Sequence, residues 1–107
     1  MKSYYIVAYT FRAEMACPNC VRNWGRDRLR EHGYTEKDIK YIESAALDYG
    51  AGFAARESEN ILHKLSFLMG INLDDYYSFD SDNFPKVVFA DQVEEDEYCG
   101  VCLEKIL

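Results

Sequence analysis

The sequence is poor in proline and in basic residues, and both shortages exclude classes of protein. Two prolines in 107 residues leave no proline-rich linker, so we expect a single domain that spans residues 1–107. Twelve Lys and Arg oppose 19 Asp and Glu, which gives a net charge of −7. A protein that neutralises phosphates needs a surplus of basic residues, so nucleic acid is disfavoured as a partner and a basic protein surface is favoured.

Long hydrophobic runs are also missing from the sequence. No stretch reaches the roughly 18 consecutive apolar residues that a membrane-spanning helix needs, so we expect no membrane partner. Aromatic residues recur through residues 1–11, so this segment does not form the apolar stretch of a signal peptide. These features predict a cytoplasmic protein. In that reducing compartment, paired cysteines are more often metal ligands or redox centres than structural disulfides.

Two segments have the patterning of β-strands. Residues 3–12 alternate between two faces in β-favouring residue types, and residues 86–90 form a shorter apolar run. Aromatic residues make up 15% of the chain, more than a small two-stranded sheet and one small core easily bury. This excess favours self-association, so a homo-oligomer is one expectation.

A helix is expected over residues 20–32, ending at Gly33 in the position where helices favour glycine. Arg22, Arg26 and Arg30 follow one flank of this helix at steps of four residues. A solvated face paired with acids is the favoured interpretation of this arginine stripe. The alternatives are a site for a phosphate or an acidic partner, and compensation of the charge of a nearby metal centre.

Two more helices are expected between the strands. One begins after Thr35. Its apolar stripe allows a single helix to about residue 56 or a shorter helix that ends at Gly50, and we favour the single long helix. The other begins at Ser58 as its N-cap and ends at Gly70. It should direct these apolar residues inward: Ile61, Leu62, Leu65, Leu68 and Met69.

The strongest motif in the sequence is a pair of Cys-x-x-Cys units, Cys17/Cys20 and Cys99/Cys102, which use every cysteine of the chain. This spacing lets a tight turn aim two thiolates at one point, and two such turns complete a tetrahedral four-cysteine site. Zinc is the favoured metal, and iron is the alternative because a four-sulfur tetrahedron accepts either. A closed four-cysteine site has no open position for water or substrate, so the sequence predicts no enzyme and no catalytic residue.

The two cysteine pairs are separated by 78 residues, 21 to 98, far more than in an ordinary zinc ribbon. If the two strands pair in parallel through a helical crossover, both pairs emerge at the same sheet edge. We therefore expect an α+β fold with a small two-stranded parallel sheet. About three helices form the insert between the strands, and a zinc ion ties the termini together.

Other groups of residues give weaker evidence for a functional site. A thioredoxin-like dithiol remains the rival to the metal site, because Cys17 and Cys20 follow a strand and open a helix. His32 and His63 are more easily explained as a helix cap and a polar-face residue than as metal ligands. The acidic loop at 80–83 lacks the ligand and glycine positions of a calcium-binding loop.

The two ends of the chain carry a resemblance to a group of known proteins. Residues 9–12 running into 17–20, and residues 78–89 running into 99–102, resemble small proteins of bacteriophages. The resemblance implies metal-binding cysteines and the cytoplasm of a prokaryotic host, and it supplies no activity. We therefore expect a small acidic zinc-binding protein, phage-encoded, that acts as a binding or regulatory module on a host or phage protein; the alternative is a cytoplasmic thiol-disulfide redox protein.

Overall fold

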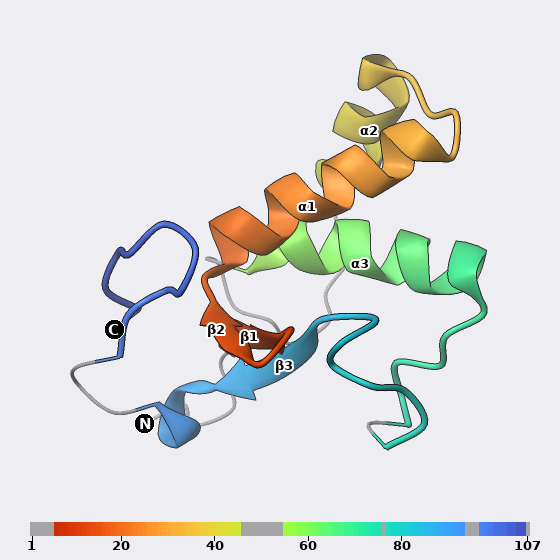
Figure 1. The fold of residues 1–107 in the computed structure, drawn as a ribbon. Helices are drawn as coiled ribbons and strands as arrows, with labels where there is room; N and C mark the ends of the chain where they lie inside the picture. Colours follow the sequence, from red (N-terminus) through yellow and green to blue (C-terminus); the bar gives the residue numbers. More distant parts are fainter. Residues whose placement is uncertain (1–5, 46–54, 76, 94–96, 107) are drawn as a thin grey trace.

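The computed structural model describes residues 6–45, 55–75, 77–93 and 97–106. Within these ranges the chain forms a mixed α+β fold, in which the helices lie on one side of a small sheet (Figure 1). In chain order the elements are β1 (Ile6–Phe11), β2 (Glu14–Ala16), α1 (Pro18–Glu31), α2 (Glu36–Glu43), α3 (Arg56–Met69), β3 (Lys86–Phe89) and a 3-10 turn (Ala90–Gln92).

The sheet differs from the predicted one. Its described strands run in the order β2-β1-β3, and both outer strands pair antiparallel to β1. The expected two-stranded parallel sheet is therefore wrong. The third strand arises from a tight hairpin at Arg12 and Ala13, whose φ angles of 53° and 65° reverse the chain after β1. Turns of this kind favour Asn-Gly, so an Arg-Ala pair gives no recognisable turn signal in the sequence.

The hairpin helps to explain why the two cysteine pairs still meet. Both β2 and β3 are antiparallel to β1, so they run in the same direction. Residue 17 follows β2 directly, and the chain beyond β3 continues toward residue 99 from the same end of the sheet. The expectation that both cysteine pairs emerge at one end of the sheet is confirmed, although the parallel strand pairing assumed for it is not.

Helix α1 is confirmed with slightly shifted bounds. Pro18 occupies its first turn, where the missing N–H costs nothing. At the other end Gly33 has a φ of 90°, its N–H donates to Arg30 O, and the N–H of Tyr34 donates to Leu29 O. This is the Schellman arrangement expected for a glycine-terminated helix.

Helix α2 is shorter than predicted. Thr35 and Asp38 form a reciprocal capping box at its start, as the sequence suggested. The helix ends at Glu43, with Ser44 as its C-cap. The prediction of one helix to about residue 56 is therefore wrong. The alternative was an end at Gly50; the helix ends before that residue, which itself lies outside the described residues. Because the apolar stripe continued past Glu43, the periodicity alone did not show where the helix stops.

Helix α3 ends at Gly70, whose left-handed φ of 71° confirms its role as C-cap. Its start differs from the prediction, because Ala55 is the N-cap and Ser58 is buried inside the first turn. The Ser58 hydroxyl donates to Ala55 O and lies 2.9 Å from the hydroxyl of Tyr9. Met69 was expected to face inward and is partly exposed. No helix in the described part of the chain is long and apolar enough to cross a bilayer.

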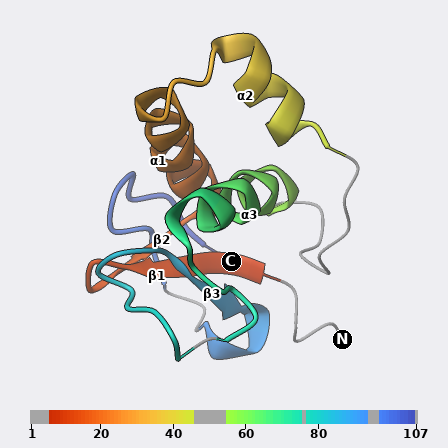
Figure 2. The same ribbon diagram turned by 90° about the vertical axis from the view of Figure 1, so that its right-hand side faces the viewer.

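The core lies between the sheet and helices α1 and α3 (Figure 2). At the crossing of the two helices, a Cβ added to Gly25 would overlap Cγ2 of Ile61, so a side chain there would push the helices apart. Phe84, from the loop before β3, is fully buried and packs edge-to-face against Trp24. A smaller cluster covers the other part of the sheet and consists of Ala8, Val88 and Val93 with Val7, Met15 and Ile106 packed against it.

Candidate metal centre

The N-terminal cysteine pair lies at the junction of β2 and α1. Cys17 is the N-cap residue of α1, and Cys20 follows in its first turn. The helix begins here because Pro18 sets the first helical φ and the Cys17 carbonyl accepts from the N–H of Val21 at 3.1 Å. Both sulfurs are therefore carried by the start of a helix that is anchored in the core.

The C-terminal pair lies on a loop held mostly by backbone hydrogen bonds. The N–H of Cys99 donates to Glu104 O at 2.9 Å, and the N–H of Leu103 donates back to Cys99 O at 3.0 Å. The N–H of Gly100 donates to Met15 O of β2 at 2.7 Å. A Cβ at Gly100 would approach the Glu14 side chain to 3.1 Å, so glycine lets this loop lie against β2.

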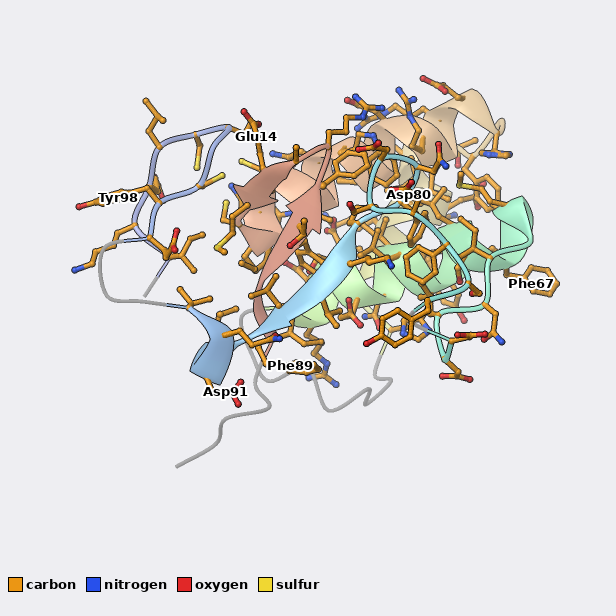
Figure 3. All side chains as sticks on the ribbon, turned by 60° about the horizontal axis from the view of Figure 1, so that its bottom comes forward. Glu14, Phe67, Asp80, Phe89, Asp91 and Tyr98 are labelled. Atoms are coloured by element: carbon orange, nitrogen blue, oxygen red, sulfur yellow. The ribbon has the colours of Figure 1, made fainter. Side chains whose placement is uncertain are left out.

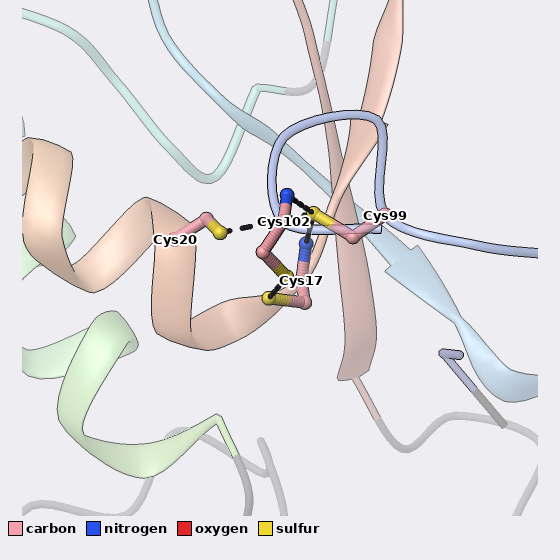
Figure 4. Close-up of side chains that lie close together, drawn as sticks. All are labelled: Cys17, Cys20, Cys99 and Cys102. Atoms are coloured by element: carbon pink, nitrogen blue, oxygen red, sulfur yellow. Dashed lines mark hydrogen bonds between the residues drawn. The ribbon is translucent and has the colours of Figure 1, made fainter. Parts of the chain in front are cut away.

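The four sulfurs converge on one point (Figure 4). All ligand atoms of Cys17, Cys20, Cys99 and Cys102 lie within 4.8 Å of one another. The Sγ–Sγ distance is 3.7 Å between Cys17 and Cys102 and 3.8 Å between Cys20 and Cys99. A tetrahedron with metal–sulfur bonds of about 2.3 Å has edges of about 3.8 Å, whereas a disulfide needs about 2.05 Å. All four residues are described, and none forms a disulfide.

Backbone donors favour the thiolate at Cys99. Burial alone would raise the pKa of this thiol, but the N–H groups of Cys102, Cys17 and Val101 point at its sulfur and lower the pKa to about 6. The three N–Sγ distances are 3.5, 3.3 and 3.3 Å, in that order. Metal ligation requires thiolates, so these donors favour the form of Cys99 that binds a metal.

The N-terminal thiols have the opposite tendency. Burial raises the pKa of the Cys17 thiol, and burial together with the neighbouring cysteines raises that of Cys20. Four thiolates cannot be crowded together without a cation, because like charges at this distance disfavour one another's ionisation. The donor set thus fits a soft divalent metal, since such an ion supplies the missing positive charge.

The arginines of the stripe on α1 form ion pairs with acidic residues. Arg22 donates to Glu57 at 2.8 Å, which ties α1 to α3. The Nε of Arg26 lies 3.6 Å from Glu43 of α2, an ion pair too long for a hydrogen bond. The expected pairing with acids is therefore confirmed, although Arg22 and Arg26 are half-buried and not fully solvated. The remaining member of the stripe, Arg30, pairs with Asp27 and Glu36.

Neither histidine joins the cluster of sulfur ligands. His32 caps the C-terminus of α1 and is exposed, as expected from its place before Gly33. His63 Nε2 lies 3.6 Å from the buried carboxylate of Glu59. Among the described residues, the four cysteines are the group of potential metal ligands that lie close together.

Sequence reasoning missed the parts of the site that are made by backbone. The N–H groups that donate to Cys99, and the Met15 carbonyl that receives the loop, carry no residue-type signal. Residues 13–16 lie outside both predicted strands, but they form the second half of the hairpin and the strand β2. A strand of three residues is too short for a period-two pattern to be recognised.

Comparison of the chain with models of protein families, with curated proteins and with solved structures gave no match. The centre is therefore interpreted from its own geometry and chemistry.

Proposed function

We propose that the chain is a small zinc-binding protein in which the four cysteines form a closed, structural metal site. The observation that carries this proposal is the convergence of two cysteine pairs from distant parts of the sequence, with sulfur–sulfur distances of 3.7 and 3.8 Å. These distances equal, within a tenth of an ångström, the edge of a zinc–thiolate tetrahedron of about 3.8 Å.

A metal at this point would act on the stability of the fold. It would close a loop that contains α1, α2, α3 and β3, and the closure entropy of a long loop favours such a link. Four protein ligands would leave no coordination position for a substrate, so the site supports no reaction at the metal. The function that remains is binding: an acidic module whose metal fixes a surface for another protein.

The cellular setting of this module follows from the sequence alone. We infer a cytoplasmic protein from the cysteine usage, and a phage origin with a host or phage protein as partner from the resemblance of the two chain ends. The single-domain organisation over residues 1–107 belongs to the same proposal, because the metal would join both ends of the chain.

The test of the proposal is the metal content of protein purified without added zinc. We expect about one zinc per chain, with iron as the outcome that would change only the identity of the metal. Cys99→Ser should lose the metal and lower the unfolding temperature. Lys105→Ser is the matched control, because it places a serine in the same loop without removing a sulfur. Protein that holds no metal and contains disulfides by mass spectrometry would contradict the proposal.

A redox protein is the second candidate, and one observation favours it. Cys17 lies at the start of a helix that follows a strand, and its sulfur is 3.7 Å from that of the exposed Cys102. In a dithiol enzyme the cysteine at the helix N-terminus has a lowered pKa, whereas burial raises the pKa of Cys17. Disulfide-reductase activity that is lost in Cys17→Ser, with the fold retained, would favour this candidate over the zinc site.

A further inference from the structure

The loop that carries the C-terminal cysteine pair has an unusual residue directly after Cys102. Leu103 adopts a φ of 66°, in the left-handed region that glycine favours, and its side chain is 74% exposed. The turn requires this backbone conformation, because the Leu103 N–H reaches back to Cys99 O. A glycine would adopt it without strain, whereas leucine adopts it at a cost and gains no burial in return.

Leu103 is not isolated. Val101 is 63% exposed and Tyr98 is 53% exposed on the same loop. Figure 3 shows this loop standing at the side of the molecule, with Tyr98 pointing away from the sheet and Glu14 beside the loop. We call Tyr98, Val101 and Leu103 the knuckle tip. Apolar side chains that gather on one exposed loop are typical of a surface that another molecule covers.

The surroundings of the knuckle tip are acidic. Glu14 packs against Gly100, and Glu104 lies exposed next to Leu103. Among residues 97–106, which the structure describes, two are acidic, Glu97 and Glu104, and one is basic, Lys105. A zinc ion bound by four thiolates would add a net charge of about −2. The complementary partner therefore carries positive charge around an apolar centre.

This charge distinguishes between the kinds of occupant. A second copy of the chain, docked through the same tip, would bring acids against acids, and each copy carries a net charge of −7. A nucleic acid would present phosphates to the same acidic surface. A polypeptide segment that mixes lysine or arginine with large apolar side chains satisfies both the tip and its rim.

We propose that the knuckle tip is the docking surface for such a basic, apolar segment of another protein. The proposal rests on the proposed function, because the metal would fix the loop that presents the tip. Leucine at position 103 is then a residue that contributes to binding at the expense of the stability of its own turn.

The test uses metal-loaded protein and three synthetic peptides of equal length, labelled for fluorescence anisotropy. One carries leucine and lysine on opposite faces at helical spacing, the second replaces lysine by glutamate, and the third replaces leucine by serine. We expect binding only of the leucine–lysine peptide, weakened by added salt. Binding of the serine–lysine peptide with equal affinity would show that charge alone attracts it, and would overturn the proposal.

Variants of the protein provide the sharper test. Leu103→Gly should weaken binding of the leucine–lysine peptide about fivefold to tenfold, while it raises the unfolding temperature by relieving the left-handed leucine. Val101→Ser should also weaken binding of this peptide, but it should not raise the unfolding temperature. Phe67→Ser is the matched control, because Phe67 is 80% exposed on α3, and it should bind like the unaltered protein.

The outcomes separate this proposal from the metal site. Unchanged peptide binding in a zinc-loaded Leu103→Gly protein would overturn the docking surface and leave the zinc site intact. Protein that contains no metal would refute the proposed function, whatever the peptide does. A dimer of the unaltered protein in sedimentation equilibrium that is lost in Leu103→Gly would assign the tip to a second copy, and would overturn the proposed partner.

Discussion

The two cysteine pairs have the same spacing but are held in different ways. The N-terminal pair is part of a hydrogen-bonded helix start, and the helix that follows buries Val21 and Leu29 in the core. Its geometry is therefore fixed by the packing of the rest of the protein. The C-terminal pair lies on a loop that is held by a few backbone hydrogen bonds, by the fully buried Cys99 and by Ile106, which packs against the smaller cluster.

This difference predicts which half of the site would depend on a bound metal. A helix that is packed on a sheet keeps its cysteines in place whether or not a metal is bound. Apart from the fully buried Cys99, residues 98–105 of this loop are exposed, so we expect most of the energy of metal binding to appear as ordering of this loop. The N-terminal half serves as a preformed site, and the C-terminal half would complete it.

Removal of the metal should have the largest effect and should be confined to one half. We expect a chelator to abolish the hydrogen-exchange protection of the Cys99, Leu103 and Ile106 amides, because structural zinc contributes about 10 kcal/mol or more in small zinc domains. The amides of Val21 and Leu29 should stay protected. Hydrogen exchange with mass spectrometry measures both regions in one experiment.

The control for that experiment is Cys99→Ser, which should show the unprotected loop before the chelator is added and no change afterwards. Equal loss of protection in α1 and α3 would contradict the comparison, since it would mean that the metal holds the whole fold together.

A substitution in the core should have the reverse pattern. The hydroxyl of the fully buried Tyr9 donates to Oε2 of Glu59 at 2.7 Å, and the Glu59 side chain is itself buried. Tyr9→Phe removes the donor and leaves a buried carboxylate with one partner fewer, so we expect a loss of about 2 kcal/mol or more in the free energy of unfolding. Urea denaturation measures this loss, and the metal content should not change.

The same tyrosine predicts how stability depends on alkaline pH. Burial, followed by the charge of Glu59, raises the pKa of Tyr9 well above its ordinary value of 10.0. Above about pH 10 the unfolded chain loses this proton while the folded protein keeps it, so the free energy of unfolding falls as the pH rises. Below that pH the contribution is complete. Tyr9→Phe should show a shallower alkaline decline, and an unchanged slope would contradict this assignment.

A smaller effect is expected at the crossing of α1 and α3. Gly25→Ala places a methyl group against Cγ2 of Ile61. Overpacking costs about 1 to 3 kcal/mol, and the better helix propensity of alanine returns about 1 kcal/mol. We expect a net loss of about 1 kcal/mol by urea denaturation, again with unchanged metal content. In the Ile61→Ala background the same substitution should no longer destabilise, and a loss there of equal size would show that the contact is not the cause.

The sequence predicted those features that depend on residue type at short range. Gly33 and Gly70 end their helices as expected, the Thr35 capping box is present, and residues 86–89 form a strand. The four cysteines could be assigned to one site because two Cys-x-x-Cys units account for every cysteine in the chain. Each of these features is encoded in a few neighbouring residues.

The features that were not predicted depend on long-range packing. The hairpin at Arg12 and Ala13 has no glycine or asparagine, so nothing local showed that the chain reverses there. The antiparallel pairing of β3 with β1 is a long-range contact as well, and no local pattern indicated it. Likewise, Ser58 has the residue type of a helix cap, but in the fold its hydroxyl lies inside the core beside Tyr9.

The long separation of the two cysteine pairs has a consequence for biosynthesis. During translation Cys17 and Cys20 are made first, and the chain must continue through every helix and through β3 before Cys99 and Cys102 appear. A polypeptide interrupted anywhere between these points can offer a metal at most half of the thiolates. Under the proposed zinc function, loading of the ion would therefore distinguish a chain that contains both cysteine pairs from a fragment that stops before Cys99, and only the former would display an ordered tip.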